Sequence, residues 1–275
     1  IALRQGEVRI SNAELRLLPP APSETQAPVT PGVLTGNFLY RTDDAQVSFD
    51  LTGAVVPLAG IQRIQAPSLP VGGQLSFHLA GDGPLRAPRV DGTLRLVNLK
   101  LGDDVLGSFQ GKLNSDGTRM TLDVDSEIST GEVHSHAEAM LSDGYPVTGR
   151  MSLKQVDVDP FITAGLRLQG LTGHSSIDGD VSLSGSLLDP DTLVWDVNLS
   201  RVSVSYASVN LENSGPVRLQ YRRNEVRVQP ATLRGPETDL LISGSVHFNT
   251  DRALDLRHVD LRGQIEAEEA QAVAE

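Results

Sequence analysis

Hydrophobic and polar residues alternate along most of this chain, in short segments that begin with glycine. In eight places a glycine is followed by any residue, an apolar residue, any residue and a second apolar residue. An apolar residue at every second position is the period of a β-strand with one apolar and one polar face. We expect each glycine to supply a turn or bulge before its strand. The copies occupy residues 6–10, 36–40, 73–77, 92–96, 149–153, 179–183, 215–219 and 244–248.

The pattern predicts an all-β protein built from a degenerate repeat of strands, with at most one or two short helices. Residues 19–31 (PPAPSETQAPVTP) are rich in proline, which lacks a backbone donor and interrupts both strands and helices. Asp159 followed by Pro160 has the residue types of a helix N-cap and first helical position. The turns expected at residues 114–117 (NSDG) and 142–144 (SDG) are typical of hairpins.

These signals divide the chain into six segments. We expect strands that continue from an upstream part (1–18), a Pro-rich linker or loop (19–31), a first β-repeat block (32–158), a short helix or connector (159–170), a second β-repeat block (171–262) and an Ala/Glu-rich tail (263–275).

A sheet with one apolar face must cover that face. The chain offers almost no helix to do so, and aromatic residues make up only 4% of it, so any interior is aliphatic. Packing on a second sheet and curling around something apolar remain open alternatives. In the second case the candidate residues lining a groove are Phe49, Leu75, Phe77, Leu79, Leu94, Leu96, Met120, Leu122, Val124, Val181, Leu183, Val217, Leu219, Val226, Val228, Leu240, Ile242, Val246 and Phe248.

Several stretches resemble the TamB/AsmA-like family of periplasmic lipid-transport proteins. Residues 171–190 (LTGHSSIDGDVSLSGSLLDP) resemble its glycine-rich strand unit, as does 215–221 (GPVRLQY) leading into 240–246. Residues 156–161 (VDVDPF) resemble the lead-in to a short helix before a new repeat block. The resemblance covers most of residues 32–262. Each motif alone is weakly specific, and the resemblance depends on the order in which the motifs occur.

The resemblance implies a long, U-shaped, taco-like sheet whose apolar inner groove shields phospholipid acyl chains between the inner and outer membranes. It implies a periplasmic location, an inner-membrane anchor and an outer-membrane partner protein, the last two outside this segment, and a possible role in outer-membrane biogenesis. It implies no catalytic residue and no cofactor. The family's anchoring helix and terminal domain have no counterpart in these residues.

Composition narrows the range of partners. A net charge of −12 argues against nucleic acid or an anionic membrane surface as the main partner. The absence of cysteine excludes disulfides and thiolate metal sites. No apolar run reaches the length of a transmembrane helix.

Few residues are candidates for metal binding or catalysis. His134, Ser135 and His136 place two imidazoles on one strand face, but the sequence supplies no third metal ligand, and two solvent-facing histidines are the favoured interpretation. The pairs Asp123/Asp125 and Asp157/Asp159 have the residue types of glycoside hydrolysis. In residues 122–125 (LDVD), however, the alternation turns both acids to water.

Three other features have ordinary structural interpretations. We expect residues 81–83 (GDG) to form a hairpin turn, Trp195 to pack against apolar neighbours, and Arg222 with Arg223 to lie in a solvated turn.

The leading hypothesis is therefore a non-enzymatic lipid conduit. A secreted β-rich adhesin, passenger or structural domain with a closed core is the main alternative. An enzyme that acts on polysaccharide comes third.

Overall fold

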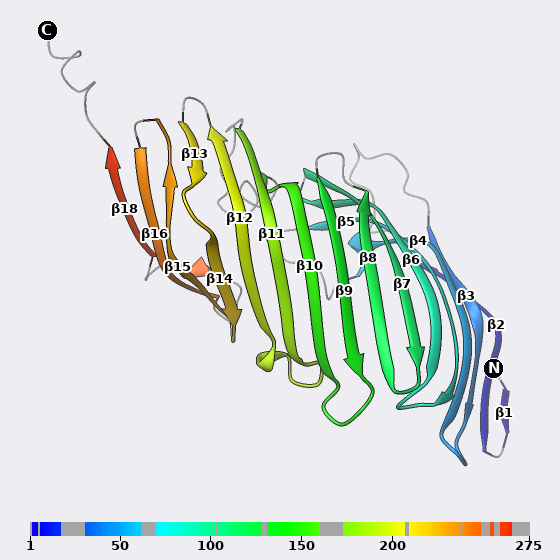
Figure 1. Ribbon diagram of the computed structural model, residues 1–275. Coiled ribbons are helices and arrows are strands. Elements are labelled where there is room, and N and C mark those ends of the chain that lie inside the picture. Colours follow the sequence, from blue (N-terminus) through cyan, green and yellow to red (C-terminus); the bar gives the residue numbers. More distant parts are fainter. Residues whose placement is uncertain are drawn as a thin grey trace, which may run out of the picture.

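The protein is an all-β chain whose described strands form one continuous sheet (Figure 1). The computed structural model describes residues 2–4, 6–17, 31–61, 70–102, 104–127, 131–159, 173–206, 209–236, 238–248, 254–255 and 259–265. Within these residues 18 strands belong to the same antiparallel sheet, which confirms the predicted fold class at this level.

Apart from the three-residue first strand, the strands in the first two thirds of the chain are long for a globular protein. They are β1 (Ala2–Arg4), β2 (Glu7–Leu17), β3 (Gly32–Arg41), β4 (Gln46–Pro57), β5 (Val71–Pro84), β6 (Arg89–Leu101), β7 (Asp104–Asp116), β8 (Arg119–Glu127) and β9 (Glu132–Met140). They continue with β10 (Pro146–Asp157), β11 (Gly173–Ser186), β12 (Val194–Tyr206), β13 (Val209–Asn213), β14 (Val217–Arg222), β15 (Glu225–Arg234), β16 (Thr238–Phe248), β17 (Leu254–Asp255) and β18 (Val259–Ile265). In the part of the chain that the structure describes, the single-turn helices η1 (Leu58–Gly60) and η3 (Pro190–Thr192) lie between strands.

The topology is a meander in which strands that are consecutive along the chain pair with each other. This order runs without interruption from β1 to β12. Strands β13 and β14 both pair with β12 and with β15, so together they occupy one position in the sheet. Figure 1 shows the result: the strands follow chain order, and β1 and β18 lie at opposite ends of the sheet.

The two repeat blocks predicted from the sequence belong to the same sheet, because β10 of the first block pairs with β11 of the second. The predicted Pro-rich segment (19–31), short helix (159–170) and tail (263–275) lie almost entirely outside the described residues.

The predicted hairpins are confirmed where the turn residues are strongest. Gly117, with φ of 88°, lies in the connection between β7 and β8, and Gly144, with φ of 83°, lies between β9 and β10. Arg223 and Asn224 both have positive φ in the two-residue connection between β14 and β15, as a type I′ turn requires.

The expectation that a glycine supplies a turn or bulge before each strand is confirmed only in part. Gly6 and Gly215 precede strands. Register shifts occur at Gly73 and Gly179 and beside the partners of Gly36 and Gly244, although these four glycines lie inside strands. Gly92 and Gly149 lie inside strands away from any shift. Residues 81–83 are likewise part of β5 and not a turn. For Gly92 the physical reason lies in what faces the glycine across the sheet, described below.

Candidate functional site

The pairing register sorts the side chains of the sheet into two chemically different faces. One row of directly opposed residues begins with Phe77 and Leu94 and crosses every strand position from β5 to β15. Apart from a glycine and a serine, the row is apolar: Phe77, Leu94, Gly111, Val124, Ser135, Met151, Val181, Val197, Leu219 and Val228. Similar rows lie on either side, and together they form the apolar face.

All of the predicted groove residues belong to this face by register. Each described side chain among them is half-buried, and none belongs to the buried class or the exposed class. The side chain of Phe248 lies outside the described residues. A closed core would bury most of these side chains, whereas an isolated flat strand surface would expose its large apolar groups. The apolar face is therefore neither tightly packed nor bare.

Bulky side chains lie flat across glycines of the neighbouring strand on this face. Gly53 is in register with Phe77, and a Cβ built on Gly53 would lie 2.3 Å from the Phe77 ring. Gly111 is opposite Leu94 in the same way, with a distance of 2.1 Å to Leu94 Cδ1. Because a glycine has no side chain, the space above it is filled by its partner. Among the repeated glycines, Gly92 has the same arrangement, with 2.3 Å to Leu79 Cδ2, whereas a Cβ on Gly149 would meet no atom closer than 3.5 Å.

Bulges with left-handed residues recur along the sheet. Asn12, Val55, Asn98 and Gln155 have φ between 49° and 53°, and each lies where the register of its strand shifts. The backbone N–H of each donates to a side-chain oxygen on the next strand, respectively Asn37, Ser76, Ser108 and Asp178. At a bulge, the backbone N–H of one residue has no partner in the strand ladder. Here the side-chain oxygens accept the hydrogen bond from that N–H instead.

Some residues of the apolar face are buried. Val47, Ala139 and Val147 on β4, β9 and β10, and Leu199, Leu211, Ala231 and Leu233 on β12, β13 and β15, are each at most 8% exposed. Ser175 on β11 is 1% exposed, and its hydroxyl has no hydrogen-bond partner within the described part of the chain. Buried positions on several strands therefore accompany the half-buried rows.

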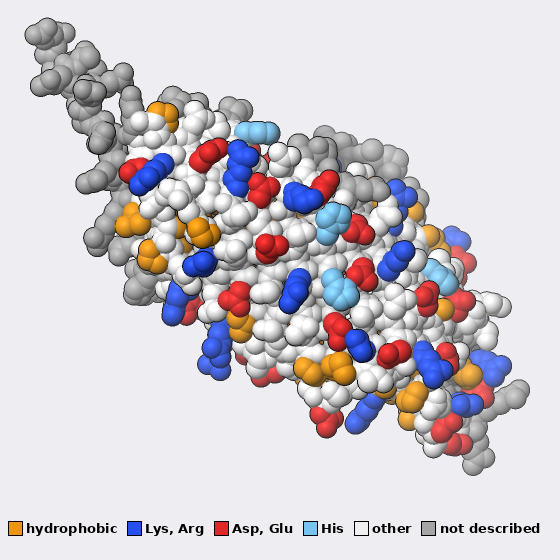
Figure 2. All heavy atoms as spheres, viewed as in Figure 1, with side chains coloured by type: hydrophobic (Ala, Val, Ile, Leu, Met, Phe, Trp, Pro, Cys, Tyr) orange, Lys and Arg blue, Asp and Glu red, His pale blue; other side chains and the backbone are white. Residues whose placement is uncertain are grey.

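The opposite face is polar. Figure 2 shows it covered by charged side chains of both signs and by histidines, with hydrophobic side chains mainly toward its margins. A hollow of about 1620 Å³ extends over it across the strands from β4 to β15. Its lining balances four basic side chains (Arg95, Lys112, Arg150 and Arg218) against four acidic ones (Asp123, Asp125, Asp180 and Asp196). Such a surface has no net attraction for a polyanion or a polycation.

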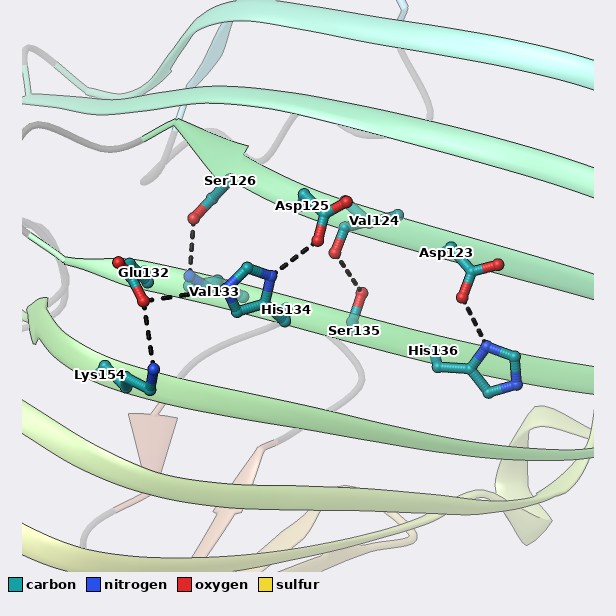
Figure 3. A network of polar contacts seen from close by, with 10 residues as sticks. All are labelled: Asp123, Val124, Asp125, Ser126, Glu132, Val133, His134, Ser135, His136 and Lys154. Atoms are coloured by element: carbon teal, nitrogen blue, oxygen red, sulfur yellow. Dashed lines mark hydrogen bonds and ion pairs between the residues drawn. The ribbon is translucent and has the colours of Figure 1, made fainter.

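Histidine and aspartate side chains that the sequence places apart meet on this polar face (Figure 3). His134 is directly opposite Asp125 and His136 is directly opposite Asp123. Their Nδ1 atoms lie 2.7 Å and 2.6 Å from the Oδ1 atoms of those aspartates. A similar pair joins His78 Nε2 to Asp50 Oδ1 over 3.1 Å. The predicted orientation of Asp123 and Asp125 toward water is confirmed, since their side chains are 52% and 71% exposed.

Two described carboxyl groups, those of Asp116 and Glu225, have lowered pKa values. The backbone N–H groups of Arg119 and Thr118 donate to Asp116 Oδ1, and they lower the pKa of that carboxyl. The Arg227 guanidinium beside Glu225 lowers the pKa of Glu225. Both groups stabilise turns or strand ends, and neither has the raised pKa of a general acid.

The remaining candidates have structural surroundings. Trp195 lies opposite Leu183 and Tyr221 on the apolar face and is half-buried. Asp157 accepts a hydrogen bond from the backbone N–H of Asp159. Within the described ranges, no three His, Cys, Asp or Glu side chains are grouped to hold a metal ion.

The comparisons with known proteins give no relative: no family model, no curated protein and no solved structure matches the chain. The described part of the chain also has no helix with the length and apolarity needed to cross a membrane.

Proposed function

We propose that this chain is a non-enzymatic segment of a lipid conduit of the TamB/AsmA-like type. In this proposal the apolar face lines a taco-like groove and shields phospholipid acyl chains between the inner and outer membranes, whereas the hollow of the polar face stays filled with water. The observation that carries the proposal is the uniform half-burial of the predicted groove residues, in register across the sheet. An apolar surface of this extent needs an apolar occupant.

The mechanism requires only bulk physical chemistry. An acyl chain in water exposes apolar surface at a cost of about 25 cal/mol per Å². A continuous apolar strip removes this cost at every point along the path, because the rows cross from strand to strand without a charged residue. The phospholipid headgroup stays in water at the open side of the groove, and the polar face of the sheet stays hydrated.

The remaining parts of the proposal rest on the family resemblance. They are a periplasmic location, an inner-membrane anchor and an outer-membrane partner outside this segment, and a role in outer-membrane biogenesis. Neither a cofactor nor a catalytic residue enters the mechanism.

One observation favours the rival, a secreted β-rich adhesin or structural domain with a closed core. Leu199, Leu211 and Leu233 on the apolar face are buried as core residues are. In the conduit these residues support the sheet locally, whereas in the rival they belong to a core that extends along the whole face.

Lipid extraction of the purified chain separates the two. The conduit predicts phospholipid in the mass spectrum of the extract, in amounts that scale with protein and survive gel filtration. A chain that carries no lipid after expression in a diderm bacterium, and takes none from phospholipid vesicles, contradicts the proposal.

Photo-crosslinking gives the position of the lipid. Crosslinkers at Phe77, Leu122 and Leu183 are expected to label acyl chains. The neighbouring positions His78, Asp123 and Ser182 serve as matched controls, because successive residues of a strand point to opposite faces. Equal labelling from both sets excludes a groove on the apolar face.

A further inference from the structure

The polar face carries a chelating pair of histidines that the lipid conduit does not use. His134 and His136 lie on the same side of β9, on either side of Ser135. Each is exposed, with 52% and 56% of the side chain accessible, and both line the hollow of the polar face. An ion in solution therefore reaches both rings.

The contacts of the two rings leave one nitrogen of each ring available. The Nδ1 atoms of both rings contact aspartate oxygens on β8, as Figure 3 shows. A carboxylate only accepts, so in a neutral imidazole this contact places the proton on Nδ1 and the lone pair on Nε2. The other acidic neighbour, Glu132 Oε2, lies 3.9 Å from His134 Nε2, beyond hydrogen-bond distance. An Nε2 lone pair of this kind is the usual metal ligand of histidine.

The spacing allows both rings to reach one ion. Side chains two residues apart on a strand are about 7 Å apart and point the same way. Imidazole nitrogens bind zinc at about 2.0–2.1 Å. Each ring now turns toward its own aspartate, so chelation requires rotation about the side-chain bonds. Because both side chains are more than half exposed, this rotation leaves no buried group without a partner.

Charges of both signs surround the two histidines. Asp123 and Asp125 are in register with them and offset the charge of the ion. On β10, His136 faces Arg150 and His134 faces Ser152, while Lys112 on β7 is in register with Asp123, so cations as well as acids border the site. We propose that His134 and His136 form a surface site for a divalent transition-metal ion, with water as the remaining ligands. Two imidazoles select Cu²⁺ most strongly, then Zn²⁺, and discriminate against Ca²⁺.

The test is calorimetric titration of the tag-free chain with Cu²⁺, Zn²⁺ and Ca²⁺, each alone, in a buffer that does not bind metals. We expect one Cu²⁺ per chain at this site, weaker binding of Zn²⁺ and no binding of Ca²⁺. The variants His134→Gln and His136→Gln are each expected to lower the Cu²⁺ affinity at least about tenfold, because the second ligand of a chelate acts at high effective concentration.

His78→Gln is the matched control. His78 is also exposed and paired with an aspartate, but its strand has Ser76 and Ala80 at the positions two residues away. We expect this variant to bind Cu²⁺ as the unaltered chain does. The proposal is wrong if His78→Gln reduces binding as much as His134→Gln, if the two histidines bind separate ions, or if Ca²⁺ binds as tightly as Cu²⁺. The lipid measurements above do not depend on these outcomes.

Discussion

Some polar atoms of this sheet have hydrogen-bond partners, and at least one buried atom has none among the described residues. Amides at the bulges find side-chain acceptors on the next strand, whereas the hydroxyl of Ser175 is buried without a described partner. A buried polar atom with no hydrogen bond lowers stability by about 1–3 kcal/mol. Stability at the residue scale therefore depends on a few local contacts that can be tested one by one.

The first prediction concerns Ser175. Ser175→Ala removes the hydroxyl, which has no hydrogen-bond partner among the described residues, and keeps Cβ, so we expect the free energy of unfolding in urea to rise by about 1 kcal/mol. Ser184→Ala, on the exposed face of the same strand, is the control and is expected to change it by less than about 0.5 kcal/mol. A loss of stability in Ser175→Ala would mean that the hydroxyl has a hydrogen-bond partner.

The second prediction concerns pH. The pKa of Asp116 is below its ordinary value of 3.8 because two backbone N–H groups donate to its carboxylate. A carboxyl group whose pKa is lower in the folded than in the unfolded state stabilises the fold at pH values above its unfolded pKa. This stabilisation is lost as the pH falls through the folded pKa. We expect NMR titration of the Asp116 carboxyl to give a midpoint below 3.8. In Thr118→Pro, which removes one donor, the midpoint is expected to rise toward that value; an unchanged midpoint contradicts the assigned cause.

At the scale of the element, the strands depend on what lies opposite each glycine. A Cβ on Gly36 would lie 2.3 Å from the backbone oxygen of Asp50, whereas a Cβ on Gly111 would meet the mobile end of Leu94. Backbone cannot move aside without breaking the ladder, but a leucine can rotate. We expect Gly36→Ala to lower the free energy of unfolding by about 2–3 kcal/mol and Gly111→Ala by less. The measurement is urea unfolding of both variants, and a reversed order would contradict this account.

The bulges give a reciprocal prediction. Val55 has φ of 53°, which is unfavourable for a β-branched residue, while Asn98 occupies the equivalent bulge of β6 with the same φ. Val55→Asn is expected to raise the free energy of unfolding by about 1 kcal/mol and Asn98→Val to lower it by a similar amount. Thermal unfolding of the two variants measures both. If both changes lower stability, side-chain packing outweighs backbone strain at these positions.

The sequence predicted the strands and the two faces of the sheet well, because a period of two depends only on neighbouring residues. Phe77, Leu122 and Leu183 share a face for this reason. The positions of the glycines were not predictable, since a glycine before a strand and a glycine opposite a leucine look alike until the register is known. The approach of His134 and His136 to Asp125 and Asp123 depends on the same register, between β8 and β9. The spacing of the histidines was visible in the sequence, but their partners were not.

At the scale of the whole molecule, the question is whether the apolar face is open along its length. Leu183 is half-buried within the apolar rows, whereas Leu199 is buried and 8% exposed. The two leucines lie on adjacent strands, with Leu183 opposite Trp195 and Leu199 opposite Gly179, so they compare a half-buried with a buried position of one face. A charge that reaches water costs little, while a charge enclosed in a core costs several kcal/mol.

We therefore expect Leu183→Asp to fold and to lose bound lipid, and Leu199→Asp to lose several kcal/mol of stability or fail to fold. Ile242→Asp, further along the half-buried rows, should behave as Leu183→Asp does. Circular dichroism and urea unfolding report the fold, and lipid extraction reports the occupant. Ser182→Asp adds the same charge to the opposite face and is expected to change neither the fold nor the amount of bound lipid. If Leu183→Asp and Ile242→Asp both fail to fold while Ser182→Asp is unaffected, the apolar face is a closed core, and the adhesin-like rival replaces the conduit.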